Sequence, residues 1–292
     1  MKLAKGLAIL SFFSILFGSC FDPPKFPDVP EIIFEDVVFC DAANTSKADS
    51  LIIILKFKDG DGDLGLDAQS AQFVAKPYHY ADFFQGINGE LVQVDLQPGQ
   101  LNSPGGIQFI DVIDVADPAA GELIFPRTRK NPAFASLPAY SCVNYEYRRF
   151  IVHVSDTAVV DKITKRDTLT LDSDEYYVYL DTLYLKSNPD HYNIEVDFLV
   201  KTDPNNPDPE KRFTEFDWRE ELCTTFDGRF PFLSETRSAL DGSLKYSMQS
   251  IGFNKAFGGK TLKLRIQIKD RALHRSNIVY TPEFTLAGIR RC

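Results

Sequence analysis

Hydrophobic and polar residues alternate along much of the chain beyond residue 31. In the segment 261–270, aliphatic residues at every second position alternate with charged or amide residues, and 192–201 repeats the pattern. An alternation of period two gives a strand one apolar face and one polar face. The run 51–58, LIIILKFK, is more continuously apolar and predicts a central strand covered on both sides. Further predicted strands cover 150–154, 176–180, 244–248 and 278–286.

Helical periodicity is scarce, and we expect short helices only within 71–85 and 214–222. The pattern therefore predicts an all-β sandwich. The segment 69–185 is less regular than the sequence on either side of it. We interpret it as a long insertion in one β-sandwich domain, 31–292, because the flanking strands resemble parts of one seven-strand set and no linker separates them. A second domain is the alternative.

The first twenty residues have the order of a secretory signal. Lys2 and Lys5 precede an apolar run over 7–17, and Gly18-Ser19-Cys20 follows. A spanning helix needs about 20 apolar residues, and this run is shorter. We predict a lipoprotein signal peptide over 1–19, with Cys20 lipidated after cleavage. The usual motif has leucine three residues before the cysteine, where this chain has phenylalanine.

Composition supports an exported, anchored protein. A tether rich in proline spans 20–30 and favours an extended, semi-rigid spacer. Cleavage of the predicted signal peptide removes Lys2 and Lys5, so the net charge of the mature chain is more negative than -9 by two. An acidic surface argues against nucleic acid as a partner and leaves membrane attachment to the acyl chains. The 44% hydrophobic content is sufficient for a large core.

Four cysteines remain when Cys20 carries lipid. They are Cys40, Cys142, Cys223 and Cys292. An even number in an oxidising compartment permits two disulfides, with three connectivities that sequence does not distinguish. We favour Cys40 with Cys142 and Cys223 with Cys292; buried free thiols are the alternative.

The segment 57–67, FKDGDGDLGLD, is the sharpest local motif. Asp59, Asp61 and Asp63 alternate with glycines, so the backbone can curl and bring three carboxylates to a common centre, as Ca²⁺ requires. The loop is no EF-hand, because Leu64 occupies the place of its essential glycine and a strand precedes it. The alternative is a polar turn that ends a strand, in which Asp and Gly are favoured without any metal.

A second polar loop, 270–277 (DRALHRSN), follows the strand that ends near residue 269. If the sandwich is immunoglobulin-like or fibronectin type III-like, 51–58 is its strand B and 262–269 its strand F. These strands run the same way, so the loops that follow them meet at one end. Asp270 then joins the three aspartates of the first loop, and Asn277 or backbone carbonyls add further oxygen ligands.

Two arginines offer an alternative to a metal ion. Arg271 or Arg275 could pair with the acidic loop and neutralise it without a cation. In the same topology the first strand begins at this end of the sandwich, so the tether is predicted to place both loops on the side that faces the membrane.

These features together resemble a group of uncharacterised outer-membrane lipoproteins from Bacteroidota. The features are the lipobox-like cysteine, the proline-rich tether, the strand entering DGDGDLG and the closing segment DRALHRSNIVYTPEFTL. The resemblance implies an outer-membrane lipoprotein with a β-sandwich and no known catalytic residue. Many lipoproteins of this group are exported to the cell surface by an acidic signal directly after the cysteine. In this chain only Asp22 is acidic there and Lys25 follows, so the sequence does not distinguish the periplasmic face from the cell surface.

Two common enzyme signatures, GxSxG and HExxH, do not occur in the sequence. We therefore expect a non-catalytic lipoprotein that acts as an interaction or accessory module, for example for an outer-membrane protein complex. One alternative is a glycan-binding lipoprotein, for which Trp218 within 216–230 is the best exposed aromatic platform. Another is a hydrolase that uses carboxylates such as Asp172, Asp174 and Glu175.

Overall fold

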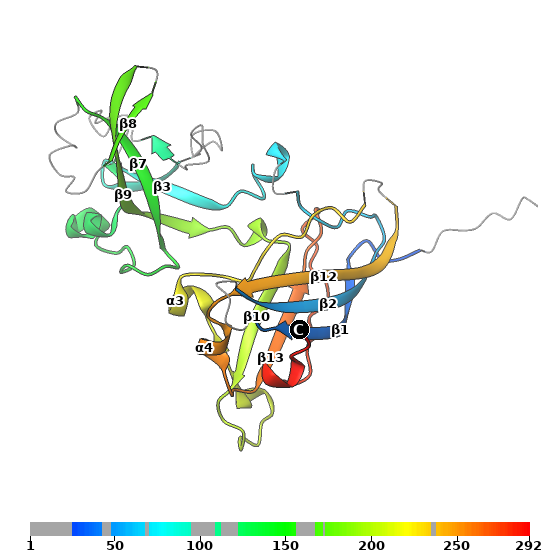
Figure 1. Cartoon of the computed structure of the whole chain (residues 1–292). Coiled ribbons are helices and arrows are strands. Elements are labelled where there is room, and N and C mark those ends of the chain that lie inside the picture. Colours follow the sequence, from blue (N-terminus) through cyan, green and yellow to red (C-terminus); the bar gives the residue numbers. More distant parts are fainter. Residues whose placement is uncertain are drawn as a thin grey trace, which may run out of the picture.

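The computed structural model describes residues 25–42, 48–67, 70–94, 109–111, 122–155, 167–171, 173–234 and 238–292. The predicted signal peptide, Cys20 and Asp172 lie outside these ranges. Within them the chain forms three β-sheets and two short α-helices, which confirms the all-β class (Figure 1).

The first sheet has three antiparallel strands with the apolar run in the middle. Its order is β1 (Glu31–Cys40), β2 (Asp49–Asp59) and β12 (Leu240–Ser250). Every second residue of β2 is buried, and the residues between are half-buried or exposed. The prediction that both faces of this strand are covered is wrong near its C-terminal end, where Lys56 and Lys58 are exposed. Antiparallel sheets commonly leave one face to solvent.

The second sheet contains the two strands with the clearest alternation. Its order is β11 (Phe213–Phe216), β10 (Ile194–Lys201), β13 (Leu262–Ile268) and β14 (Val279–Tyr280). Residues in β10 and β13 alternate between buried and half-buried positions, as their sequences predict. The strand predicted over 278–286 is reduced to β14, because Pro282 has no N–H to donate to a ladder.

These two sheets share one hydrophobic core. Leu51, Ile53 and Leu55 of the first sheet and Leu264 and Ile266 of the second are completely buried in it. The inward faces of both sheets are apolar, so burial against each other removes that surface from water.

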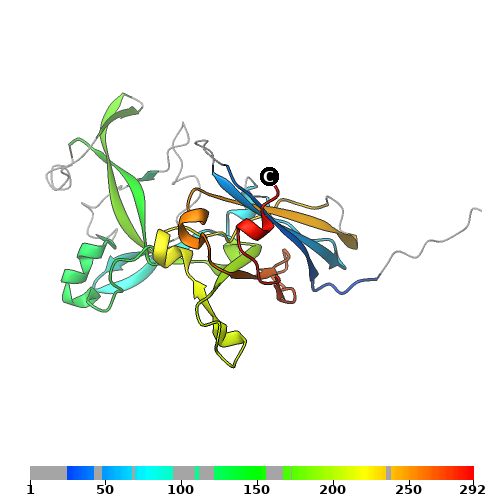
Figure 2. The same ribbon diagram turned by 60° about the horizontal axis from the view of Figure 1, so that its bottom comes forward.

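The third sheet has seven strands, all of which lie between residues 81 and 187. They are β3 (Ala81–Ile87), β4 (Glu90–Val94), β5 (Phe109–Asp111), β6 (Glu122–Leu123), β7 (Tyr145–His153), β8 (Asp167–Leu171) and β9 (Asp174–Ser187). The first two sheets draw their strands from residues before and after this segment. Figures 1 and 2 show the third sheet beside the two-sheet body, on the side away from residues 25–30.

Two short helices close one end of the shared core. In α3 (Trp218–Leu222), the Asp217 side chain caps the first turn by accepting hydrogen bonds from the N–H groups of Arg219 and Glu220. The second helix is α4 (Phe253–Phe257). Of the two segments predicted to hold short helices, 214–222 contains α3, whereas 71–85 contains only the 3₁₀ turn Ala71–Phe73, because Pro77 prevents a longer helix. No helix among the described residues has the length and apolar character needed to cross a bilayer.

The four remaining cysteines form two disulfides, and the pairing that we favoured is wrong. Cys40 bonds to Cys292 and Cys142 to Cys223, with Cα–Cα distances of 4.6 and 5.1 Å. The end of β1 lies beside the last residues, since Phe39 forms a bridge with Arg290. The second disulfide joins the residue that ends α3 to the segment before β7.

Candidate metal centre

The two polar loops predicted to be neighbours do lie together. β2 ends at Asp59, and the loop after it forms a bridge between Leu64 and Asp270, which follows β13. The backbone N–H of Arg271 also donates to the carbonyl of Asp63, at 3.2 Å. The prediction that these two loops are neighbours is therefore confirmed.

Three of the four predicted metal ligands converge. One carboxylate oxygen from each of Asp59, Asp63 and Asp270 lies within 4.8 Å of the other two. The three residues are 0%, 8% and 1% exposed, so the carboxylates are shielded from water. Asp61 lies in the same loop, is half-buried, and is not part of this group of three.

Hydrogen bonds reach only some of the carboxylate oxygens in this acidic group. One oxygen of Asp59 accepts from the backbone N–H of Asp63 at 3.0 Å. Asp270 is bound to the backbone N–H and the ring Nδ1 of His274, at 2.7 and 2.9 Å. In the described part of the chain, the Oδ1 atoms of Asp59, Asp61 and Asp63 have no hydrogen-bond partner although they are buried. Buried oxygens without partners are costly, so this site requires a proton, a water molecule or a cation.

The electrostatics of the site agree with that requirement. Burial, together with repulsion from Asp61 and Asp63, raises the pKa of Asp59 to about 6. Burial also raises the pKa values of Asp63 and Asp270. The hydrogen bond to Asp270 raises the pKa of His274. Each carboxylate thus resists ionisation while its neighbours are charged, and a bound cation would reverse that preference.

The other residues considered for this site have different partners. The Asn277 side chain exchanges two hydrogen bonds with the backbone of Ile32, so it holds β1 and does not face the carboxylates. Arg275 pairs with Glu195 at 2.8 Å. Arg271 lies over the Phe232 ring and donates to a backbone carbonyl, and within the described residues it forms no ion pair with the aspartates. Neither arginine therefore forms an ion pair with the described aspartates, and the charge of Arg271 offsets only part of the rise in the pKa of Asp63.

The tether reaches this end of the molecule, as predicted. The backbone N–H of Gly60 donates to the carbonyl of Pro27 at 2.8 Å, and the Lys58 amine lies 5.3 Å from the centre of the Phe26 ring. A Cβ at position 60 would collide with the backbone carbonyl of Phe26. The acidic loop therefore holds the chain that leads to Cys20.

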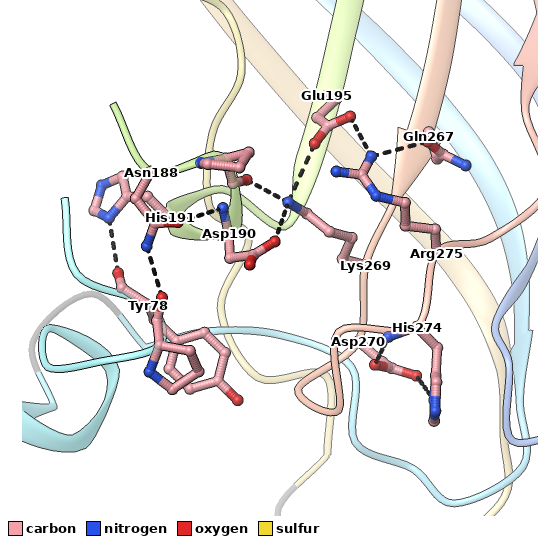
Figure 3. A network of polar contacts seen from close by, with 12 residues as sticks. Tyr78, Asn188, Asp190, His191, Glu195, Gln267, Lys269, Asp270, His274 and Arg275 are labelled. Carbon is pink, nitrogen blue, oxygen red and sulfur yellow. Dashed lines mark hydrogen bonds and ion pairs between the residues drawn. The ribbon is translucent and has the colours of Figure 1, made fainter. Parts of the chain in front are cut away.

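Lys269, which follows β13 and directly precedes Asp270, carries a second buried charge. Lys269 is 2% exposed, and its amine lies 3.1 Å from Glu195 and 3.4 Å from Asp190. Figure 3 shows Lys269 directed toward these carboxylates, while the adjacent Asp270 is directed toward His274. Strand alternation assigns Lys269 to the polar face, and sequence reasoning missed its burial because residues 189–190, distant in sequence, cover it.

Trp218 is not the exposed platform that the sequence suggested. It is 5% exposed, and the rings of Phe198, Phe216 and Phe226 lie 4.7 to 5.4 Å from it. The amphipathic start of α3 turns the indole inward, against the rings of α4.

Replacing Gly62 with alanine is expected to destabilise the acidic loop by about 1–3 kcal/mol. Gly62 has φ +69°, and a Cβ there would overlap the backbone of Ser238. Gly259 is a matched control, because its φ is +76° but its Cβ would meet nothing within 4 Å. Chemical denaturation of both variants measures the difference; equal losses for Gly62→Ala and Gly259→Ala would contradict a packed loop.

No protein-family model matches this chain, and comparisons with curated proteins and with solved structures give no match either.

Proposed function

We propose that this protein is a non-catalytic lipoprotein of the outer membrane that acts as an interaction or accessory module, with a Ca²⁺ ion that stiffens the loops at its tethered end. The observation that carries the proposal is the group formed by Asp59, Asp63 and Asp270, which are buried with one oxygen each within 4.8 Å. A divalent cation at that point offsets the mutual repulsion and accepts the lone pairs that have no hydrogen bond.

The donor set favours calcium over other common metals. All candidate ligands are carboxylate oxygens, whereas zinc prefers cysteine sulfur and histidine nitrogen. His274 is engaged with Asp270 through Nδ1. Three carboxylates, with Asp61 nearby and water completing the shell, suit the flexible coordination of Ca²⁺ better than the strict octahedron of Mg²⁺.

The order of the strands supports a fibronectin type III-like sandwich as the scaffold. β1, β2 and β12 take the places of strands A, B and E, and β10, β11, β13 and β14 those of C, C′, F and G. The third sheet is then an insertion between strands B and C. Such a scaffold presents its loops and insertions to partners, and lipid on Cys20 would hold it at the outer membrane.

Calcium at saturating concentration is expected to raise the melting temperature by about 5–10 °C relative to chelator, because it binds the folded state alone. In Asp63→Asn this shift should disappear. The same variant should melt a few degrees higher than wild type in chelator, since the substitution removes one of the repelling charges. Scanning calorimetry with calcium or with chelator measures both effects.

Asp174→Asn is the matched control, because Asp174 is exposed at the start of β9 in the third sheet. It should retain the full calcium shift and the wild-type melting temperature in chelator. Two results would contradict the proposed calcium site. One is a wild-type melting temperature that calcium does not change, and the other is an Asp63→Asn variant whose melting temperature still rises with calcium.

A further inference from the structure

A cavity of about 390 Å³ lies between the third sheet and α3. Its walls come from the residue before β3, the loop into β7, the end of β9, and α3 with the residues after it. The disulfide between Cys142 and Cys223 joins two of these walls. Figures 1 and 2 show α3 on the side of the two-sheet body that faces the third sheet. Small-molecule sites commonly have volumes of about 300–1,000 Å³ and lie where two packed units meet.

Tyrosine side chains dominate the walls of this cavity. The five tyrosines that line it are Tyr80, Tyr140, Tyr145, Tyr147 and Tyr192. Tyr145 belongs to the packed interior, because it is buried and its hydroxyl donates to the carbonyl of Pro138 at 3.0 Å. By contrast, Tyr80, Tyr140 and Tyr147 are 39%, 47% and 59% exposed. Exposed aromatic rings that gather at one cavity are typical of a binding site.

The rings of Tyr140 and Tyr147 are inclined to each other. Their centroids are 6.4 Å apart, and their planes differ by 64°. The two rings therefore cannot both stack on one flat ligand such as a nucleobase. A sugar ring is puckered and its C–H bonds point in several directions, so it can contact both rings. The negative face of an aromatic ring attracts such weakly positive hydrogens.

The polar groups of the lining are balanced in charge. The charged residues described there are one acid, Glu146, and one base, Arg219. Glu146 accepts a hydrogen bond from the hydroxyl of Tyr80 at 2.8 Å, and Arg219 donates to the hydroxyl of Ser187 at 2.9 Å. The threonines at 224–225 add two more hydroxyl groups. The cavity therefore offers donors and acceptors to a neutral ligand and no excess charge to an ion.

An apolar ligand does not suit this lining. Leu185 is the single aliphatic residue among the described residues of the walls, and it is buried. An acyl chain would cover hydroxyl groups without giving them hydrogen bonds, at a cost in free energy. A saccharide has C–H groups for the aromatic rings and hydroxyl groups for the polar side chains.

We propose that this cavity binds a neutral saccharide. A sugar ring lies against Tyr140 and Tyr147, and its hydroxyl groups exchange hydrogen bonds with Glu146 and Arg219. The assignment goes beyond the proposed function, because it gives the interaction module a ligand. It shares no residue with the calcium site, so the two proposals fail separately.

Binding is tested by calorimetric titration of the full chain with five neutral oligosaccharides: maltohexaose, cellohexaose, mannohexaose, xylohexaose and chitohexaose. We expect saturable binding of at least one of them, with an affinity that changes little as salt is raised, because the ligand is uncharged. Choline and hexaproline test the other ligands that tyrosine-lined sites accept. No saturable binding of any of the five up to about 10 mM, or tighter binding of choline or hexaproline, would overturn the assignment.

Tyr147→Ala should weaken binding of that saccharide about tenfold, because it removes one of the two rings that the sugar contacts. Tyr147→Phe keeps the ring and should stay within about threefold of wild type. Tyr280→Ala removes a similarly exposed tyrosine on β14, outside the cavity, and should bind like wild type. The melting temperatures of all three variants should lie within a few degrees of wild type, because both rings are exposed.

Two results with these variants would contradict the site. One is wild-type affinity in Tyr147→Ala, and the other is an equal loss of affinity in Tyr147→Ala and Tyr280→Ala. A calcium-dependent melting shift that persists in those cases leaves the proposed function standing.

Discussion

Replacing both Cys40 and Cys292 with serine is expected to lower the free energy of unfolding by about 5 kcal/mol, the largest loss for any change at two positions considered for this molecule. The disulfide joins residues 252 apart, so its removal frees nearly the whole chain in the unfolded state. In the folded state the same bond holds β1 against the segment that contains Arg290 and Arg291, which pair with Asp41 and Asp36.

The second disulfide provides the comparison. Cys142 and Cys223 are 81 residues apart, so their replacement with serines should cost about 1 kcal/mol less, because the entropy of loop closure grows only with the logarithm of length. Urea unfolding of the two double variants without reductant measures both losses. A smaller loss for the Cys40–Cys292 pair than for Cys142–Cys223 would contradict the argument from chain entropy.

Replacing Phe198 with alanine is expected to cost about 3–5 kcal/mol. Phe198 is completely buried in β10, and the rings of Trp218, Phe226 and Phe257 each lie 5.4 Å from its centre. Removal of its ring leaves a cavity between β10, α3 and α4 that stiff aromatic neighbours cannot fill by relaxing.

Two further variants separate this packing effect from a general loss of hydrophobic surface. Phe198→Leu retains most of the volume and should lose less than Phe198→Ala, whereas Ile251→Ala, at a residue 84% exposed, should change stability by less than about 0.5 kcal/mol. Urea unfolding gives the three values, and the emission of Trp218 reports the local change. Equal stability of Phe198→Ala and Phe198→Leu would contradict tight packing at this point.

The sequence was most informative where one physical cause dominated. In β10 and β13 alternate side chains enter the core, so period two marks both strands. The meeting of Asp59 and Asp63 with Asp270 also agrees with the sequence-based prediction that the loops after β2 and β13 are neighbours. Local chemistry then completed the prediction of an oxygen-rich site.

Sequence was least informative where distant segments meet. The disulfide pairing depends on the contact between β1 and the residues near Cys292, which no local pattern marks. Lys269 reads as a surface lysine, yet residues 189–190 bury it. Trp218 was misplaced for the same reason, since its partners come from β10, α4 and the loop at Phe226.

The covalent link at the far end of β1 has a mechanical consequence. A pull on the segment before β1 opens the β1–β2 pairs in order, from Glu31 opposite Lys58 toward Cys40 opposite Ser50. That unzipping ends at Cys40, because its bond to Cys292 transfers the load to another part of the fold. If Cys20 carries lipid, tension from the membrane would therefore open the β1–β2 pairing first, and the disulfide would keep the two-sheet body joined to the pulled strand.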